Sequence, residues 1–251
     1  ICRELGVGYA DLAGNCRLAF GTVYIERRVA KNPFPVRREQ RSLFAPKSAR
    51  VLRIMLGAPM REWKVAELAA RTGISFGQVS KVRTSLLDRE WASGKWGGVR
   101  LAQPQALLDA WQQAYTPLEK RRTRYYTLLH GDALQRAIRE AFGSLRDGQR
   151  THALLSSFSA ARWLAPYARI AGDWFYADED GEARLQTLLK LEPAAAGENV
   201  TIALARDEGV FQEAADPAPG LHSTGLIQTC LDLAATGERG GEAAEHLAIP
   251  H

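Results

Sequence analysis

The stretch of residues 46–100 carries a succession of helical signals that restricts the fold more than any other part of the chain. Apolar residues recur at helical spacing within Val51–Leu56 and again within Val65–Arg71. Gly73 then breaks the pattern, and Ser75 is a suitable N-cap for a third helix. Two helices, a glycine turn and a third helix in this order predict a helix-turn-helix.

The third helix, which we expect to reach about Glu90, carries an apolar stripe of Val79, Val82 and Leu86 at i, i+3 and i+7. Another face is polar near the helix N-terminus, where short polar side chains and a cation suit base edges and phosphates in a major groove. A basic turn and strand at residues 95–101 would form a wing. The candidate DNA-binding residues of this segment are Ser75, Gln78, Ser80, Lys81, Arg83, Thr84, Lys95 and Arg100.

Charge distinguishes this interpretation from an ordinary helical domain whose polar face is only solvated. Residues 1–127 contain 23 Lys and Arg against 10 Asp and Glu, a net charge of +13. Residues 128–251 contain 10 against 18, a net charge of −8. A basic half that carries a helix-turn-helix pattern is typical of nucleic-acid binding, and the acidic half is unsuited to lie on phosphate.

The composition excludes several other classes of protein. A chain of 251 residues that is 46% hydrophobic and 24% charged is typical of a soluble globular protein with one or two domains. Its cysteines, Cys2, Cys16 and Cys230, are scattered and form neither a disulfide framework nor a metal motif, which indicates the reducing cytoplasm. We find no signal peptide and no apolar run long enough to cross a membrane. The five histidines have no ligand spacing, so we expect no metal and no cofactor.

The sequence of residues 1–45 predicts two further segments. Residues 1–30 resemble the end of an α/β unit, with a hairpin of Cys16–Phe20 and Val23–Glu26 hinged at Gly21. The chain opens without an initiator Met, so we expect an N-terminal portion to precede it. Residues 31–45 are a proline-punctuated linker that is either a basic arm along the DNA backbone or simply solvated. The cations that would contact DNA from this arm are Arg37, Arg38 and Arg41.

The rear of the chain predicts connecting helices in residues 104–150 and an α/β domain in residues 151–251. We expect helices at residues 107–115, 131–143, 182–191 and 241–247, and strands at residues 174–177 and 200–204. The basic run of residues 118–126 is either a phosphate-contacting seam or a solvated junction in which Tyr125 and Tyr126 pack.

One pattern in this half invites comparison with nucleotidyltransferases. Ser156 and Ser157 precede a predicted helix, as in a phosphate-binding turn, and Asp178 and Asp180 could face one way on a strand and hold Mg²⁺. However, Asp-Glu-Asp-Gly is also an ordinary turn and helix-start sequence, and the serine turn lacks glycine. We therefore favour a degenerate nucleotidyltransferase-like scaffold that makes protein contacts, without catalytic residues.

Several segments of the chain are similar to a known family. GVGYADLAGNCRL at residues 6–18 is followed by VYIE at 23–26, NPF at 32–34 and RSLFAPKSARVL at 41–52. This run resembles the AbiEi-like transcriptional regulators, the antitoxin family of type IV toxin–antitoxin systems. The similarity continues through LLDAW at 107–111, RYYT at 124–127 and QTCLDL at 228–233. The resemblance implies a DNA-binding regulator, a nucleotidyltransferase-like toxin as partner, and an upstream segment with a restriction-endonuclease-like fold.

We therefore expect an α+β protein with a winged helix-turn-helix at residues 46–103. A remnant of an α/β, restriction-endonuclease-like unit would precede it, and the α/β domain would follow. The expected function is that of an antitoxin-type repressor that binds double-stranded DNA and is not an enzyme. The alternative is a DNA nuclease or DNA-processing protein whose catalytic residues lie upstream of Ile1. The sequence predicts neither the operator nor the oligomeric state, for which a homodimer is one of the alternatives.

Overall fold

The computed structural model describes residues 8–10, 15–28, 43–95, 98–148, 150–164 and 172–247. The chain divides into two compact units, Ile1–Ser42 and Leu43–His251, and each is described by itself. Both α-helices and β-sheets are present, which confirms the mixed α+β class.

The described part of the first unit is a small antiparallel sheet of β1 (Tyr9–Ala10), β2 (Cys16–Phe20) and β3 (Val23–Arg27). Strands β2 and β3 form the predicted hairpin, with Phe20 opposite Val23 and Gly21 at φ +57° in the turn. Glycine adopts this left-handed conformation without steric cost. The predicted arm cations Arg37, Arg38 and Arg41 lie outside the described residues.

The second unit begins with a helical module, which we define as residues 43–115. Its helices are α2 (Pro46–Gly57), α3 (Val65–Thr72), α4 (Phe76–Leu87) and α5 (Pro104–Ala114). Its small antiparallel sheet has the order β4 (Trp63–Lys64), β6 (Gly98–Leu101), β5 (Ala92–Ser93). The element order thus follows the sequence-based expectation, with a strand added before α3.

Local chemistry explains where α3 and α4 begin and end. Gly73 caps the C-terminus of α3 at φ +66°, and its N–H donates to the Ala69 carbonyl oxygen. Ser75 caps α4, because its side chain accepts a hydrogen bond from the Gln78 N–H at 3.3 Å. The helix ends at Leu87 and not near Glu90, which lies in the left-handed region at φ +58°. A helix cannot continue through that conformation.

The core of the helical module is closed by large buried side chains. The predicted stripe of α4, Val79, Val82 and Leu86, is buried as expected. Trp63 and Trp111 are each 2% exposed, and Phe44 stacks on Trp111 with 5.7 Å between ring centroids. Burial of aromatic rings of this size contributes much of the stability of a small core.

The rest of the unit is built on a seven-stranded mixed sheet. The order is β12 (Glu192–Pro193), β7 (Glu119–Tyr126), β13 (Val200–Ala205), β11 (Asp173–Ala177), β10 (Ala153–Leu155), β15 (Leu221–Ser223), β14 (Ala215–Ala218). Strand β13 is parallel to β11 and antiparallel to β7, while β10 is antiparallel to β11 and parallel to β15. A short pair, β8 (Arg146–Asp147) and β9 (Arg150–Thr151), stands apart.

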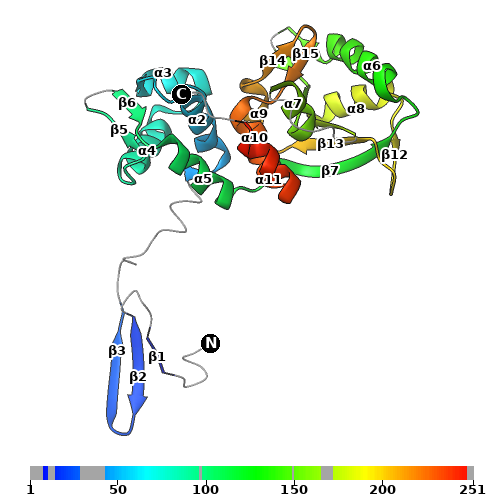
Figure 1. Ribbon diagram of the computed structural model, residues 1–251. Coiled ribbons are helices and arrows are strands. Elements are labelled where there is room, and N and C mark those ends of the chain that lie inside the picture. Colours follow the sequence, from blue (N-terminus) through cyan, green and yellow to red (C-terminus); the bar gives the residue numbers. More distant parts are fainter. Residues whose placement is uncertain are drawn as a thin grey trace. The chain divides into compact units, whose positions relative to one another are not determined.

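Helices cover both faces of this sheet (Figure 1). On one face, α6 (Gly131–Ser144) and α8 (Glu179–Leu188) pack on inward residues such as Phe175 and Ile202. On the other face lie α7 (Ser157–Leu164) and α10 (Leu226–Ala234), with α11 (Glu238–Glu245) packed against α10. The one-turn helix α9 (Gly209–Gln212) follows β13.

Helix α10 belongs to two hydrophobic cores. Ile227 and Leu231 complete the core of the helical module, whereas Cys230 and Leu233 pack with α7 and α11. One side of this helix therefore packs on the helical module, and another side packs on α7 and α11 beside the sheet.

Several expectations for the rear of the chain are wrong in detail. Residues 104–150 do not hold only connecting helices, because residues 119–126 form the long strand β7. Helix α8 begins at Glu179, three residues before the expected start, since Asp178 provides an N-cap. Helix α11 likewise spans residues 238–245 and not 241–247. Strands β14 and β15 were not anticipated.

Candidate nucleic-acid interface

One face of α4 is open to solvent. Three consecutive residues at its start and two residues one and two turns later are exposed, while Ser80 and Arg83 are half-buried at its margins. The exposed residues are Ser75, Phe76, Gly77, Lys81 and Thr84. Four of the predicted contacts, Ser75, Ser80, Lys81 and Thr84, thus lie together on or beside this face.

Gln78 has a different environment from the one that its spacing indicated. Its side chain is half-buried, and its Nε2 atom donates a hydrogen bond to the Ser48 hydroxyl of α2 at 3.0 Å. The spacing argument grouped Gln78 with Lys81 and Thr84, but Gln78 also borders the buried stripe. It therefore braces α4 against α2 in this structure. Arg83 borders the other side of the stripe, and its Nε atom is buried without a hydrogen-bond partner among the described residues.

Two more of the predicted cations lie in this strand pair, Lys95 in the turn after β5 and Arg100 in β6. Lys95 and Arg100 are both exposed. Gly94 shapes this turn, since it has φ +157° and a Cβ atom there would lie 2.3 Å from the Gly98 carbonyl oxygen. The close approach of the two backbones leaves room only for glycine.

The electrostatics of this surface suit a polyanion. Residues 46–103 contain 11 Lys and Arg against 4 Asp and Glu, a net charge of +7. Of the cations, Lys81, Lys95 and Arg100 are exposed on α4 and the strand pair that follows it. A cluster of exposed cations attracts phosphate over a range of about 8–10 Å at physiological salt.

Among the described residues, the acidic half of the chain pairs with α2 and leaves one face of α4 exposed. Arg50 of α2 donates to both carboxylate oxygens of Asp207, from Nε at 3.1 Å and from Nη2 at 2.8 Å. Arg53, which is 3% exposed, donates to Glu213 at 3.1 Å, to Gln228 at 3.2 Å and to the Gly209 carbonyl oxygen at 3.2 Å. These contacts join two cations of the basic half to carboxylates of the acidic half. No local signal in the sequence could have identified them, because the partners lie about 160 residues apart.

A buried polar network continues from this junction. Asp232 of α10 accepts hydrogen bonds from Tyr115, Tyr176 and Gln228. Burial raises the pKa of Asp232 to about 6, although these donors lower it. Burial also raises the pKa of Glu213 to about 7, against the opposing effect of Arg53. Both carboxyl groups thus titrate near neutral pH.

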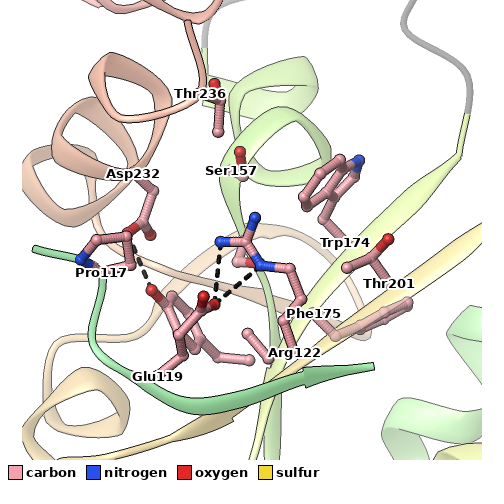
Figure 2. Close-up of a pocket in the computed structure, with 12 residues that line it drawn as sticks. Pro117, Glu119, Arg122, Ser157, Trp174, Phe175, Thr201, Asp232 and Thr236 are labelled. Atoms are coloured by element: carbon pink, nitrogen blue, oxygen red, sulfur yellow. Dashed lines mark hydrogen bonds and ion pairs between the residues drawn. The ribbon is translucent and has the colours of Figure 1, made fainter. Parts of the chain in front are cut away.

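Beside this network lies a small pocket of about 20 Å³, opening to solvent, between β7, β11, α7 and α10 (Figure 2). Arg122 lies over the Trp174 ring at 5.6 Å and pairs with Glu119 at 3.0 Å. Ser157 has the left-handed φ of +47°. The Ser157 hydroxyl and one oxygen of Asp232 are buried without hydrogen-bond partners within the part of the chain that the structure describes. The lining combines these polar groups with apolar side chains such as Trp174 and Phe175.

The carboxylates considered for Mg²⁺ are engaged in structural contacts. Asp178 is the N-cap of α8, accepts from the Gly181 N–H at 2.8 Å and pairs with His152 at 2.9 Å. Asp180 lies within the helix and not on a strand. The helix-start interpretation of this sequence is therefore confirmed. Among the described residues, no group of three or more His, Cys, Asp or Glu side chains could hold a metal ion.

Comparison with protein families matches residues 100–248, more than half of the chain, to a family described as transcriptional regulator, AbiEi antitoxin, type IV toxin–antitoxin system. The protein therefore falls in the class of transcriptional regulators. More particularly, the chain belongs to the AbiEi antitoxin family, as the sequence resemblance indicated. Searches of curated proteins and of solved structures found no match.

The matched segment contains α5 and the seven-stranded sheet with its helices, while α2, α3 and α4 precede it. The family is one of regulators and not of enzymes, and an antitoxin implies a toxin as partner. No helix in the described ranges is long and apolar enough to cross a membrane.

Proposed function

We propose that this antitoxin regulates transcription by binding duplex DNA through the helical module, which acts as a winged helix-turn-helix. Helix α4 would enter the major groove, and the β5–β6 turn would act as the wing. Ser75, Ser80, Lys81 and Thr84 would contact DNA from α4, and Lys95 and Arg100 from the wing. Gln78 and Arg83 would support this face from its margins.

One observation carries the proposal. The acidic half docks on α2 through Arg50 and Arg53, and the face of α4 that holds Lys81 and Thr84 stays exposed. A recognition helix whose polar face was packed against the protein's own acidic half could not reach a groove. Lys81, Lys95 and Arg100, which stay exposed, support the same conclusion, since counterion release drives binding to phosphate.

Lys81→Ala tests the role of α4. The operator is first obtained by selecting duplexes from a random library with the protein, and affinity is then measured at several salt concentrations. If Lys81 neutralises one phosphate, the variant binds more weakly and the slope of log K against log salt falls by about 0.9. Lys190→Ala is the matched control, because Lys190 is an exposed lysine in the turn between α8 and β12. An unchanged slope for Lys81→Ala would contradict the proposal.

We further propose, from the sequence resemblance, that the toxin partner is nucleotidyltransferase-like and that the seven-stranded sheet domain takes part in assembly or neutralisation. Co-purification of the whole chain with the toxin, followed by cross-linking and mapping of the linked residues, tests this assignment. Cross-links confined to the helical module would contradict it.

A further inference from the structure

Phe76 is the first residue of α4, and its side chain is 59% exposed. Trp63 and Trp111 of the same module, by contrast, are each 2% exposed. Phe76 thus contributes little to the core. Single exposed apolar residues are common on protein surfaces, so exposure alone does not assign a function to Phe76.

The next residue, Gly77, is a glycine that the described fold does not require. It is the second residue of α4, its φ is not positive, and a Cβ added to it would meet no described atom within 4 Å. Gly94, by contrast, requires glycine because a Cβ would lie 2.3 Å from a backbone oxygen. Glycine is a weaker helix former than alanine, and no contact or backbone conformation among the described residues requires glycine at position 77.

Gly77 lies on the face that would meet DNA, and Phe76 borders that face. Gly77, Lys81 and Thr84 follow one another at i, i+4 and i+7 along α4, so they line one side of the helix. Phe76 precedes them in the first turn. In helix-turn-helix proteins the residues near the N-terminus of the recognition helix contact base edges.

We propose that the first turn of α4 is the point of closest approach to the DNA. Gly77 leaves the room for base edges that a side chain would occupy, and Phe76 packs on the 5-methyl group of thymine in the major groove. The inference rests on the proposed function of α4 and names the base feature that it reads. Thymine is the base with a methyl group in that groove, and phenylalanine is a suitable apolar partner for it.

Replacement of thymine by uracil in the selected operator tests Phe76, because it removes only the methyl group. Each position is replaced in turn, and affinity is measured for the wild type and for Phe76→Ala. At one thymine in each site the wild type should lose about fourfold in affinity, the value for one buried methyl group. Phe76→Ala should bind the thymine operator more weakly and show no difference between thymine and uracil. A difference that persists in Phe76→Ala overturns the role of Phe76.

Gly77→Ala tests the close approach. The variant should melt about 2 °C higher than the wild type, because alanine favours the helix. It should nevertheless bind the operator about tenfold more weakly, since a methyl group in a close-packed contact forces the partners apart. The matched control is Gly143→Ala, at an exposed position of α6 where a Cβ also meets no described atom within 4 Å. Gly143→Ala should gain stability without losing affinity, and equal affinity for Gly77→Ala overturns the inference.

The outcomes separate this inference from the proposed function. If the wild type selects a duplex and Lys81→Ala lowers the salt slope, but Phe76→Ala and Gly77→Ala bind normally, the close approach of the first turn fails alone. If the wild type selects no duplex, both proposals fail. Binding of the toxin by Phe76→Ala at reduced affinity, with operator binding intact, assigns the exposed ring to a protein partner and overturns the thymine contact.

Discussion

The guanidinium group of Arg53 lies 3.1 Å from the carboxylate of Glu213, inside the junction between α2 and the sheet domain. The Arg53 side chain is 2% exposed, and Gln228 and the Gly209 carbonyl oxygen accept its remaining hydrogen bonds. A buried cation with three acceptors fixes the orientation of α2 on α10, because each of its donors has a defined direction. The pair therefore determines which face of the helical module stays free.

Replacement of Arg53 should destabilise the whole second unit. Arg53→Met leaves Glu213, Gln228 and the Gly209 carbonyl oxygen without their donor, and the loss of one partner of a buried pair costs about 3 kcal/mol of unfolding free energy. Urea denaturation measures the change. Arg61→Met is the control, since the Arg61 side chain is 50% exposed and its pairing with Glu67 should contribute less than about 1 kcal/mol. A loss below that value for Arg53→Met would contradict this role.

Stability should also depend on the ionisation of Glu213. Its pKa is raised from 4.5 to about 7 in the folded protein, so the folded state binds the proton more tightly than the unfolded state between these values. The unfolding free energy therefore falls as pH rises from about 4.5 through 7. Because the Glu213 side chain is 24% exposed, solvent screening reduces the loss to about 2 kcal/mol.

Glu213→Gln removes this titration and isolates its contribution. Asp232, whose pKa is raised to about 6, contributes a dependence of the same sign in both proteins and cancels from the comparison. The variant and the wild type should be similar in stability near pH 5, and the variant should be more stable at pH 8. Parallel curves across this range would show that Glu213 titrates normally.

Ser75 gives a prediction that separates folding from binding. Ser75→Ala removes the N-cap of α4 and should cost about 1 kcal/mol of unfolding free energy. Ser75→Asp keeps a capping oxygen and so keeps most of the stability, but it adds a negative charge where a phosphate would lie. We expect Ser75→Asp to bind operator DNA about tenfold more weakly than Ser75→Ala, as shown by melting curves and binding titrations side by side. Equal binding by the two variants would place Ser75 away from DNA.

Asp178 should matter for stability alone. It caps α8 and pairs with His152 and Arg150, so Asp178→Ala should cost about 1–2 kcal/mol in unfolding free energy. Operator affinity, measured below the melting transition, should not change. Asp178→Asn serves as the control, since asparagine retains the cap and loses only the ionic contacts. A loss of affinity in Asp178→Asn would show that the acid acts on DNA binding.

The sequence predicted the helical module well because its signals are local. Val79, Val82 and Leu86 define a buried stripe by spacing alone, and Gly73 and Ser75 mark the ends of helices through their own backbone chemistry. Gln78 shows the limit of that reasoning. From its position beside the stripe, the side chain could face either solvent or α2. A hydrogen bond to Ser48, thirty residues earlier, holds it against α2.

The central sheet was predicted less well for a related reason. Strand β7 carries Arg121, Thr123 and Tyr125 at alternate positions, so the usual apolar alternation of a half-buried strand is missing. Arg121 and Tyr125 instead bond to Glu182 of α8, at 2.7 and 2.9 Å. A polar inner face of this kind depends on a partner far along the chain, which charge counting cannot locate. The net charge of each half likewise did not reveal that Arg50 and Arg53 would pair with Asp207 and Glu213.

The double membership of α10 limits how the chain can be divided experimentally. A fragment that ends after α5 would lose Ile227 and Leu231 from its core and leave Arg53 without its acceptors. Such a truncation would expose an apolar surface on α2 and tend to aggregate. Because one helix contributes to both cores, we expect the helical module and the sheet domain to unfold together in a single transition.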